Sequence, residues 1–161
     1  MTAKQKKIEE YKAKIPDLLD YFKSFLNTQK IEIDTFKYSE AECNQIEETM
    51  KGYFRGHESE YLDIENYRPI YKKPVLLKKD INYDAFAAYI GEFVIHNTSS
   101  EYDIGRTKTV WEGDITWKFE GLGSCSVTPD SIIHFILRSK TEESIFQIIN
   151  YFLKSNNDKL K

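Results

Sequence analysis

The segment Asn82-Tyr-Asp-Ala-Phe-Ala-Ala-Tyr-Ile-Gly-Glu-Phe-Val-Ile-His-Asn-Thr98 is the stretch around which the rest of the chain must pack. Between Asp84 and His96 its only charged residue is Glu92, and the other side chains are small, aliphatic or aromatic. This composition gives a helix that is apolar on nearly all sides, and such a helix lies inside a protein core. It is too short to span a bilayer, which requires about 20 apolar residues. We therefore predict a buried central helix.

Two details of this segment predict how the helix begins and how it packs. Asp80 or Asn82 is expected to cap its N-terminus, since both side chains accept hydrogen bonds from the first turn. Gly91 lowers helix propensity by about 1 kcal/mol relative to alanine. Its presence therefore indicates that another element approaches the helix closely at this position.

The composition is that of one folded domain. The chain has 161 residues, of which 40% are hydrophobic and 14% aromatic, and this aromatic content argues against disorder despite 30% charged residues. The net charge of −3 gives no reason to expect nucleic-acid binding. Cys43 and Cys125 match no metal-ligand spacing, so we expect free thiols in a reducing compartment. The N-terminus lacks an apolar leader, which predicts a cytoplasmic protein without a membrane partner.

Helical patterns are predicted before the central helix. Residues 3–28 follow a helical period in which Pro16 either opens a second helix or kinks one long helix. Ser39-Glu-Ala-Glu42 is a capping box, in which the Ser39 hydroxyl and the Glu42 carboxylate bind each other's backbone N–H groups. Residues 57–79 show no clear period and are expected to form an ordered loop.

After the central helix the period changes from helix to strand. Residues 99–105 are rich in turn-forming residues, whereas residues 107–120 alternate about Gly113-Asp114, which suits a two-residue type II′ turn. That turn pairs Val110 with Trp117 and Glu112 with Ile115. A third strand is expected at residues 124–127.

The C-terminal part predicts two further helices. Thr128-Pro129-Asp130 supplies an N-cap and a first turn for a helix through Leu137. A last amphipathic helix is expected from Thr141, and residues 155–161 are expected to fray. The chain is thus predicted to be a single α+β domain over residues 1–161, with N-terminal helices, a buried central helix, a two- or three-stranded antiparallel meander and a C-terminal helical hairpin.

Acidic residues are concentrated between residues 31 and 66, where ten acids and three bases give a net charge of −7. One explanation is a solvated helix face. The other is a surface that attracts a basic protein, because such a field steers association. Trp111 either packs under a helix or is exposed as a hydrophobic anchor of the kind found in interface hot spots. The candidate partner-binding residues are Glu40, Glu47, Glu48, Glu58, Glu60 and Trp111.

Glu92 and His96 lie one turn apart on the central helix, which is the spacing of an acid–base pair or of two metal ligands. A metal site requires at least a third ligand, and His57 and His134 lie in no recognised spacing. The structural interpretation is that Glu92 hydrogen-bonds to a neighbouring backbone group or cation while His96 caps the helix C-terminus.

Four short motifs follow one another along the chain: Ala88-Tyr-Ile-Gly-Glu92 on the central helix, Trp111 on a strand, Val127-Thr-Pro129 before a helix, and Glu142-Glu143 at the start of the last helix. Their order resembles a family of small bacterial domains with a Tyr-x-Gly-Glu helix, a Trp strand and a Val-x-Pro turn. Some members of that kind are similar to immunity proteins of polymorphic-toxin systems. The resemblance covers residues 80–155, implies an α+β layout and transfers no catalytic residue.

Two functions follow as expectations. The first is a non-catalytic protein-binding domain, an immunity-type inhibitor whose acidic surface binds a basic toxin domain, with no cofactor. The second is a small enzyme or metal protein built on Glu92 and His96.

Overall fold

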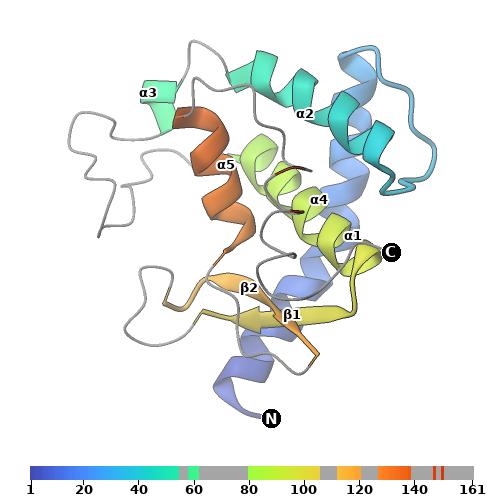
Figure 1. Ribbon diagram of the computed structural model, residues 1–161. Coiled ribbons are helices and arrows are strands. Elements are labelled where there is room, and N and C mark those ends of the chain that lie inside the picture. The colour runs from blue at the N-terminus through green and yellow to red at the C-terminus, as the bar shows by residue number, and fades with distance from the viewer. Residues whose placement is uncertain are drawn as a thin grey trace.

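The computed structural model describes residues 1–54, 58–61, 80–105, 112–120 and 127–138, together with the helical positions Gln147 and Asn150. In these ranges the protein is α+β, with helices and a two-stranded antiparallel sheet (Figure 1). No helix in the described ranges combines the length and the apolar character that a membrane crossing requires. The predicted last helix and the tail at residues 155–161 lie outside the described residues, apart from those two positions.

Helix α4 (Ile81–Asn97) lies in the middle of the molecule, with α1, α2 and α5 around it and the sheet at one end (Figure 1). Asp80 is its N-cap, since the Asp80 carboxylate accepts the Tyr83 N–H at 2.9 Å. Ten of its 17 residues are buried. The prediction of a buried central helix is confirmed.

Helix α1 (Ala3–Thr28) is one continuous helix with Pro16 inside it. Pro16 therefore does not open a second helix. Thr2 caps it in a capping box with Gln5, whose side-chain oxygen accepts the Thr2 N–H at 2.9 Å. The buried Phe22 and Leu26 lie in the second half of α1, which packs along α4. The first half of the helix extends past α4 toward the sheet (Figure 1).

Helix α2 (Glu40–Phe54) begins with half of the predicted capping box. The Ser39 hydroxyl accepts the Glu42 N–H at 3.2 Å, as expected. The Glu42 carboxylate instead accepts the N–H groups of Lys37 and Tyr38, at 2.9 and 3.0 Å. Tyr38 has a positive φ of 54°, and the turned backbone there directs two successive N–H groups toward this carboxylate. Helix α3 (Glu58–Tyr61) is a single turn.

The sheet differs from the predicted hairpin. Strands β1 (Ser100–Ile104) and β2 (Ile115–Phe119) pair antiparallel, with Ile104 opposite Ile115 and Tyr102 opposite Trp117. The predicted pairing of Glu112 with Ile115 is therefore wrong, because Glu112 lies in the turn before β2, whereas Val110 lies outside the described residues. The first strand lies in the segment that looked turn-rich, because Tyr102 packs into the core beside α4 and this burial outweighs the turn-forming composition of its neighbours.

The turn before β2 still depends on Gly113, which has a φ of 81° and donates its N–H to the Gly105 carbonyl at 3.2 Å. A positive φ of this kind is readily adopted only by glycine. The predicted third strand lies outside the described residues except for Val127, which is not in a strand.

Helix α5 (Pro129–Arg138) starts as predicted, because the Thr128 hydroxyl accepts the Ser131 N–H at 2.9 Å and Pro129 occupies the first helical position. Its inner face buries Ile132, Ile133 and His134 against the core.

Candidate functional site

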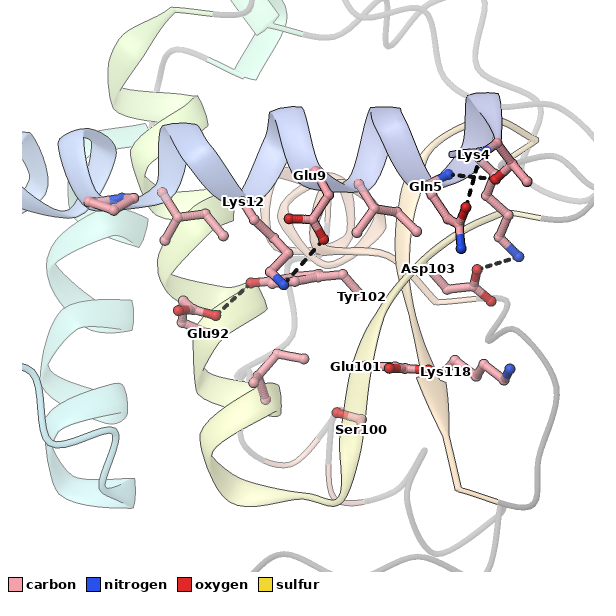
Figure 2. Close-up of a pocket in the computed structure, with 15 residues that line it drawn as sticks. Lys4, Gln5, Glu9, Lys12, Glu92, Ser100, Glu101, Tyr102, Asp103 and Lys118 are labelled. Carbon is pink, nitrogen blue, oxygen red and sulfur yellow. Dashed lines mark hydrogen bonds and ion pairs between the residues drawn. The ribbon is translucent and has the colours of Figure 1, made fainter.

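A groove of about 690 Å³ opens between the first half of α1, the second half of α4 and strand β1 (Figure 2). Its apolar lining comes from Ile8, Ile15 and Ile95, and its polar lining includes Ser100. Its charged lining consists of Lys4, Glu9, Lys12, Glu92, Glu101, Asp103 and Lys118. A volume of this size lies in the range that binding sites for small ligands and short peptide segments occupy.

Tyr102 and Glu92 form the floor of this groove. The Tyr102 side chain extends from β1 toward α4, and its hydroxyl donates to the Glu92 carboxylate at 2.9 Å (Figure 2). Burial, together with the charge of Glu92, raises the pKa of Tyr102 far above its ordinary value, so its hydroxyl remains a donor. The ring of Tyr11 meets the Tyr102 ring edge-on at 5.3 Å. The floor is thus a fixed phenol–carboxylate pair.

Gly91 makes this arrangement sterically feasible. A Cβ atom at position 91 would lie 2.7 Å from the Tyr102 hydroxyl oxygen and 3.2 Å from Cε1 of its ring. The Gly91 carbonyl also accepts the indole N–H of the buried Trp117 at 3.2 Å. The close approach predicted from Gly91 is confirmed, and the element that approaches is the sheet.

Two ion pairs neutralise much of the remaining charge in the groove. Lys4 contacts the carboxylate of Asp103 at 2.6 Å, and the Asp103 side chain is only 4% exposed. Lys12 contacts Glu9 at 3.5 Å, between two well-exposed side chains. The first pair ties the start of α1 to β1 at one end of the groove.

Glu92 and His96 have separate partners. Glu92 accepts the Tyr102 hydroxyl, whereas the exposed ring of His96 stacks on Tyr38 with 4.2 Å between ring centroids. Among the described residues, no group of three or more His, Cys, Asp or Glu residues is arranged to hold a metal ion. Glu92 and His96 therefore interact with different residues, Tyr102 and Tyr38 respectively.

Cys43 lies on the inner face of α2 and is buried. Burial, with neighbouring glutamates as a smaller cause, raises the pKa of its thiol to about 12. A thiol with such a pKa is not ionised near neutral pH and is a poor nucleophile. Cys125 lies outside the described residues.

The acidic candidates divide into two groups. Glu40, Glu48 and Glu60 are exposed, as expected of a binding surface. Glu47 is 3% exposed and contacts Lys51 at 3.3 Å, so its expected place on the outer face is wrong. The side chain of Glu58 and the whole of Trp111 lie outside the described residues.

Glu47 is buried because of its position in the helical period. The buried residues of α2 are spaced at i, i+3, i+4, i+7 and i+11, which is one continuous apolar stripe that includes position 47. They are Cys43, Ile46, Glu47, Met50 and Phe54.

The segment 31–54, which we call the acidic segment, carries six acids and two bases. Its exposed carboxylates belong to Glu32, Asp34, Glu40 and Glu48. In the described part of the chain, none of the four takes part in an ion pair. Glu32 and Asp34 lie in the connection between α1 and α2, and the loop shape of that connection is visible beside α2 in Figure 1.

Sequence reasoning did not identify Tyr102 or Asp103 as site residues. The signal was the alternation in Glu101-Tyr-Asp-Ile104, where Tyr102 and Ile104 share one side and the two acids the other. It is only four residues long, which is too short to outweigh the serines before it.

Comparison of the chain with protein-family models, curated proteins and solved structures gives no match.

Proposed function

We propose that this chain is a non-catalytic protein-binding domain, an immunity-type inhibitor that binds a basic toxin domain through its acidic segment. The observation that carries the proposal is the set of four exposed carboxylates in that segment, at Glu32, Asp34, Glu40 and Glu48.

Three acids elsewhere in the described chain differ from these four, because each contacts a lysine. Asp20 contacts Lys23 at 3.3 Å, Glu9 contacts Lys12, and Asp103 contacts Lys4. Those carboxylates are neutralised locally, whereas Lys37 is the one exposed base between residues 31 and 50. An uncompensated field of one sign raises the association rate with a partner of opposite charge and disfavours partners of like charge.

The inhibitor role is tested in cells. The product of the gene next to this one would be expressed under an inducible promoter, with and without this chain. We expect growth arrest by that product alone, rescue by the chain, and a stable complex between the two purified proteins. Growth arrest that persists when the chain is present would contradict the inhibitor role.

The acidic segment is tested by association kinetics with the same partner. The triple variant Glu32→Gln, Glu40→Gln and Glu48→Gln is expected to slow association about tenfold at low ionic strength. The effect is expected to disappear in high salt, because the Debye length falls from about 10 Å at 0.1 M to about 3 Å at 1 M.

A matched control separates a local surface from net charge. Glu10→Gln, Asp17→Asn and Glu120→Gln change the charge by the same amount at exposed positions outside the segment. The control variant is expected to associate at nearly the parental rate. Equal slowing in both variants would remove the acidic segment from the interface.

The alternative, a small enzyme or metal protein built on Glu92 and His96, is tested by elemental analysis of the purified chain. A stoichiometric transition metal that is lost in a His96→Ala variant would replace the binding proposal with this one.

A further inference from the structure

In the described ranges, strand β1 presents one unpaired edge. Within the described part of the chain, β2 is the one strand that pairs with it. Gly105 donates its N–H to the Asp114 carbonyl at 2.8 Å, and the Ser99 carbonyl accepts the Glu120 N–H at 3.3 Å.

In an antiparallel pair, hydrogen-bonded and non-hydrogen-bonded positions alternate along the strand. Since Ser99 and Gly105 bond across the pair, Glu101 and Asp103 also direct their main-chain groups toward β2. The N–H and C=O groups of Ser100, Tyr102 and Ile104 therefore point away from β2. An exposed edge of this kind is a template for a further strand.

This edge borders the groove described above. Residues 100–103 line the groove, and Figure 2 shows β1 along one wall, with α1 crossing one end and α4 opposite. The apolar side chains of Ile8, Ile15 and Ile95 line the same space. An extended segment lying along β1 would thus find main-chain partners on one side and apolar contacts on the other.

The charged residues of the groove determine which charge a side chain of the bound segment can have. Lys4 and Lys12 are engaged with Asp103 and Glu9, respectively. The sheet register places Glu101 directly opposite Lys118, where opposite charges attract across the strands.

Glu92 is the groove carboxylate that has no lysine or arginine partner among the described residues. It is half-buried, and in the described part of the chain its one hydrogen bond comes from the neutral Tyr102 hydroxyl. A half-buried carboxylate of this kind attracts a cationic side chain, because the low local dielectric strengthens the interaction.

We propose that the groove binds an extended peptide segment, which adds to the outer edge of β1 and places a lysine or arginine side chain against Glu92. Side chains alternate between the two faces of a strand, so the basic residue lies on the face that Tyr102 also uses. Main-chain bonds to Ser100 and Tyr102 supply affinity, and Glu92 supplies selectivity. This site lies outside the acidic segment and does not depend on the proposed inhibitor function.

The test uses three blocked heptapeptides of alternating threonine and valine, with lysine, glutamine or glutamate at the central position. Binding is followed through the backbone amide resonances of the isotope-labelled full chain. We expect the lysine peptide to shift the amides of Ser100, Tyr102 and Ile104, and to bind most tightly, with the glutamate peptide weakest. Absence of these shifts with the lysine peptide at millimolar concentration would overturn the proposal.

Two further peptides test strand addition itself. Both are the lysine peptide with N-methyl groups on alternate backbone nitrogens, and the two forms carry the methyl groups on opposite sets of nitrogens, so that only one of them removes the donors that face β1. We expect binding to be lost in the form methylated on the nitrogens facing β1. Undiminished binding by both alternately methylated forms would show that the groove does not act as a strand edge.

Two variants test the role of Glu92. Glu92→Gln keeps an acceptor for the Tyr102 hydroxyl and removes the charge. It is expected to weaken binding of the lysine peptide by up to about fivefold and to leave binding of the glutamine peptide unchanged. Glu101→Gln makes the same charge change in the same groove and is expected to have little effect.

If Glu92→Gln weakened binding of the lysine and glutamine peptides equally, the proposal that Glu92 selects a basic side chain through its charge would be contradicted. The comparison of the three peptides on the parental chain needs no variant, so it decides the question even where a variant folds poorly. The acidic-segment triple variant is expected to bind the lysine peptide normally, which separates this proposal from the proposed function.

Discussion

Helices α4 and α2 have nearly the same length, 17 and 15 residues, and they differ in how much of their surface contacts solvent. α4 is in contact with protein on nearly every side, and even its glycine is in contact with an aromatic ring. α2 buries one stripe, and its outer side carries Glu40 and Glu48 into solvent.

The difference indicates where stability and recognition reside in this molecule. A buried side chain on α4 cannot change size without moving a neighbour, because close-packed interiors do not relax freely. A side chain on the outer side of α2 contacts mainly solvent, so its charge is available to a partner. Substitutions in the two helices should therefore separate into stability effects and binding effects.

The largest effect is expected from Gly91→Leu in α4. The new side chain begins 2.7 Å from the Tyr102 hydroxyl oxygen and must displace a ring that is packed against Tyr11 of α1. Overpacking of this kind costs about 1–3 kcal/mol or more. Chemical denaturation of the purified variant measures the loss in unfolding free energy.

Gly52→Ala on α2 is the matched control. A Cβ atom at position 52 meets no other atom within 4 Å. Alanine there is expected to stabilise the helix by up to about 1 kcal/mol, because it has the higher helix propensity. Combining Gly91→Ala with Tyr102→Phe should recover part of the loss caused by Gly91→Ala alone. A destabilisation of the same size at both glycines would remove the contrast between the helices.

The next effect is expected at alkaline pH, at the contact between α2 and α4. Burial raises the pKa of the Cys43 thiol from 9.0 to about 12, and burial also raises the pKa of Tyr89 above its usual range. The folded state thus holds protons that the unfolded state has released, so stability falls as pH rises above 9.

Each such group contributes a slope of about 1.4 kcal/mol per pH unit between its unfolded and folded pKa values. Cys43→Ser removes one titrating group and is expected to make the decline between pH 9 and 10 shallower by up to about one such slope, while the buried tyrosines supply the rest of the decline. Denaturation curves at several pH values measure the slope. An identical decline in the variant would mean that the thiol ionises normally in the folded protein.

A comparable or smaller effect is expected on α2, where Glu47 is buried and its neighbour Glu48 is exposed. Glu47→Gln leaves Lys51 beside a neutral group in a mostly buried contact, and it is expected to cost about 1–3 kcal/mol. Glu48→Gln, one residue along on the exposed side, should change the unfolding free energy by less than about 0.5 kcal/mol. Equal effects from these neighbouring glutamates would show that the outer side of α2 also contributes to folding.

The sequence predicts α4 well because several independent features of the sequence indicate the same helix. Composition, the Asp80 cap and Gly91 all indicate one buried helix, and each is visible without knowing its neighbours. The caps of α2 and α5 are also readable, since the side chains of Ser39 and Thr128 bind backbone groups only three residues away. Local interactions of this kind leave a pattern in the sequence.

The sheet and the groove were missed because they depend on contacts between distant residues. Tyr102 is in a strand because it packs on Tyr11 and hydrogen-bonds to Glu92, and no local pattern records either contact. The charge of Glu47 predicts a surface position, although its place in the helical period lies on the buried stripe. Periodicity was the better guide than residue type at that position.

The smallest stability effect is expected from the triple variant Glu32→Gln, Glu40→Gln and Glu48→Gln. Removing three like charges relieves repulsion within the segment, which favours the folded state slightly. Glu40 opposes this gain, because it lies in the first turn of α2 and interacts favourably with the helix dipole by about 0.3–1 kcal/mol. The two terms nearly cancel, so the unfolding free energy should change by less than about 0.5 kcal/mol, and the change should shrink in high salt. Thermal and chemical denaturation at low and high ionic strength, beside the Glu10→Gln, Asp17→Asn and Glu120→Gln control, measure it. A loss of several kcal/mol would mean that these carboxylates contribute to the stability of the fold. Slower association by the variant could then result from a change in the fold and could not be assigned to the loss of charge at the binding surface.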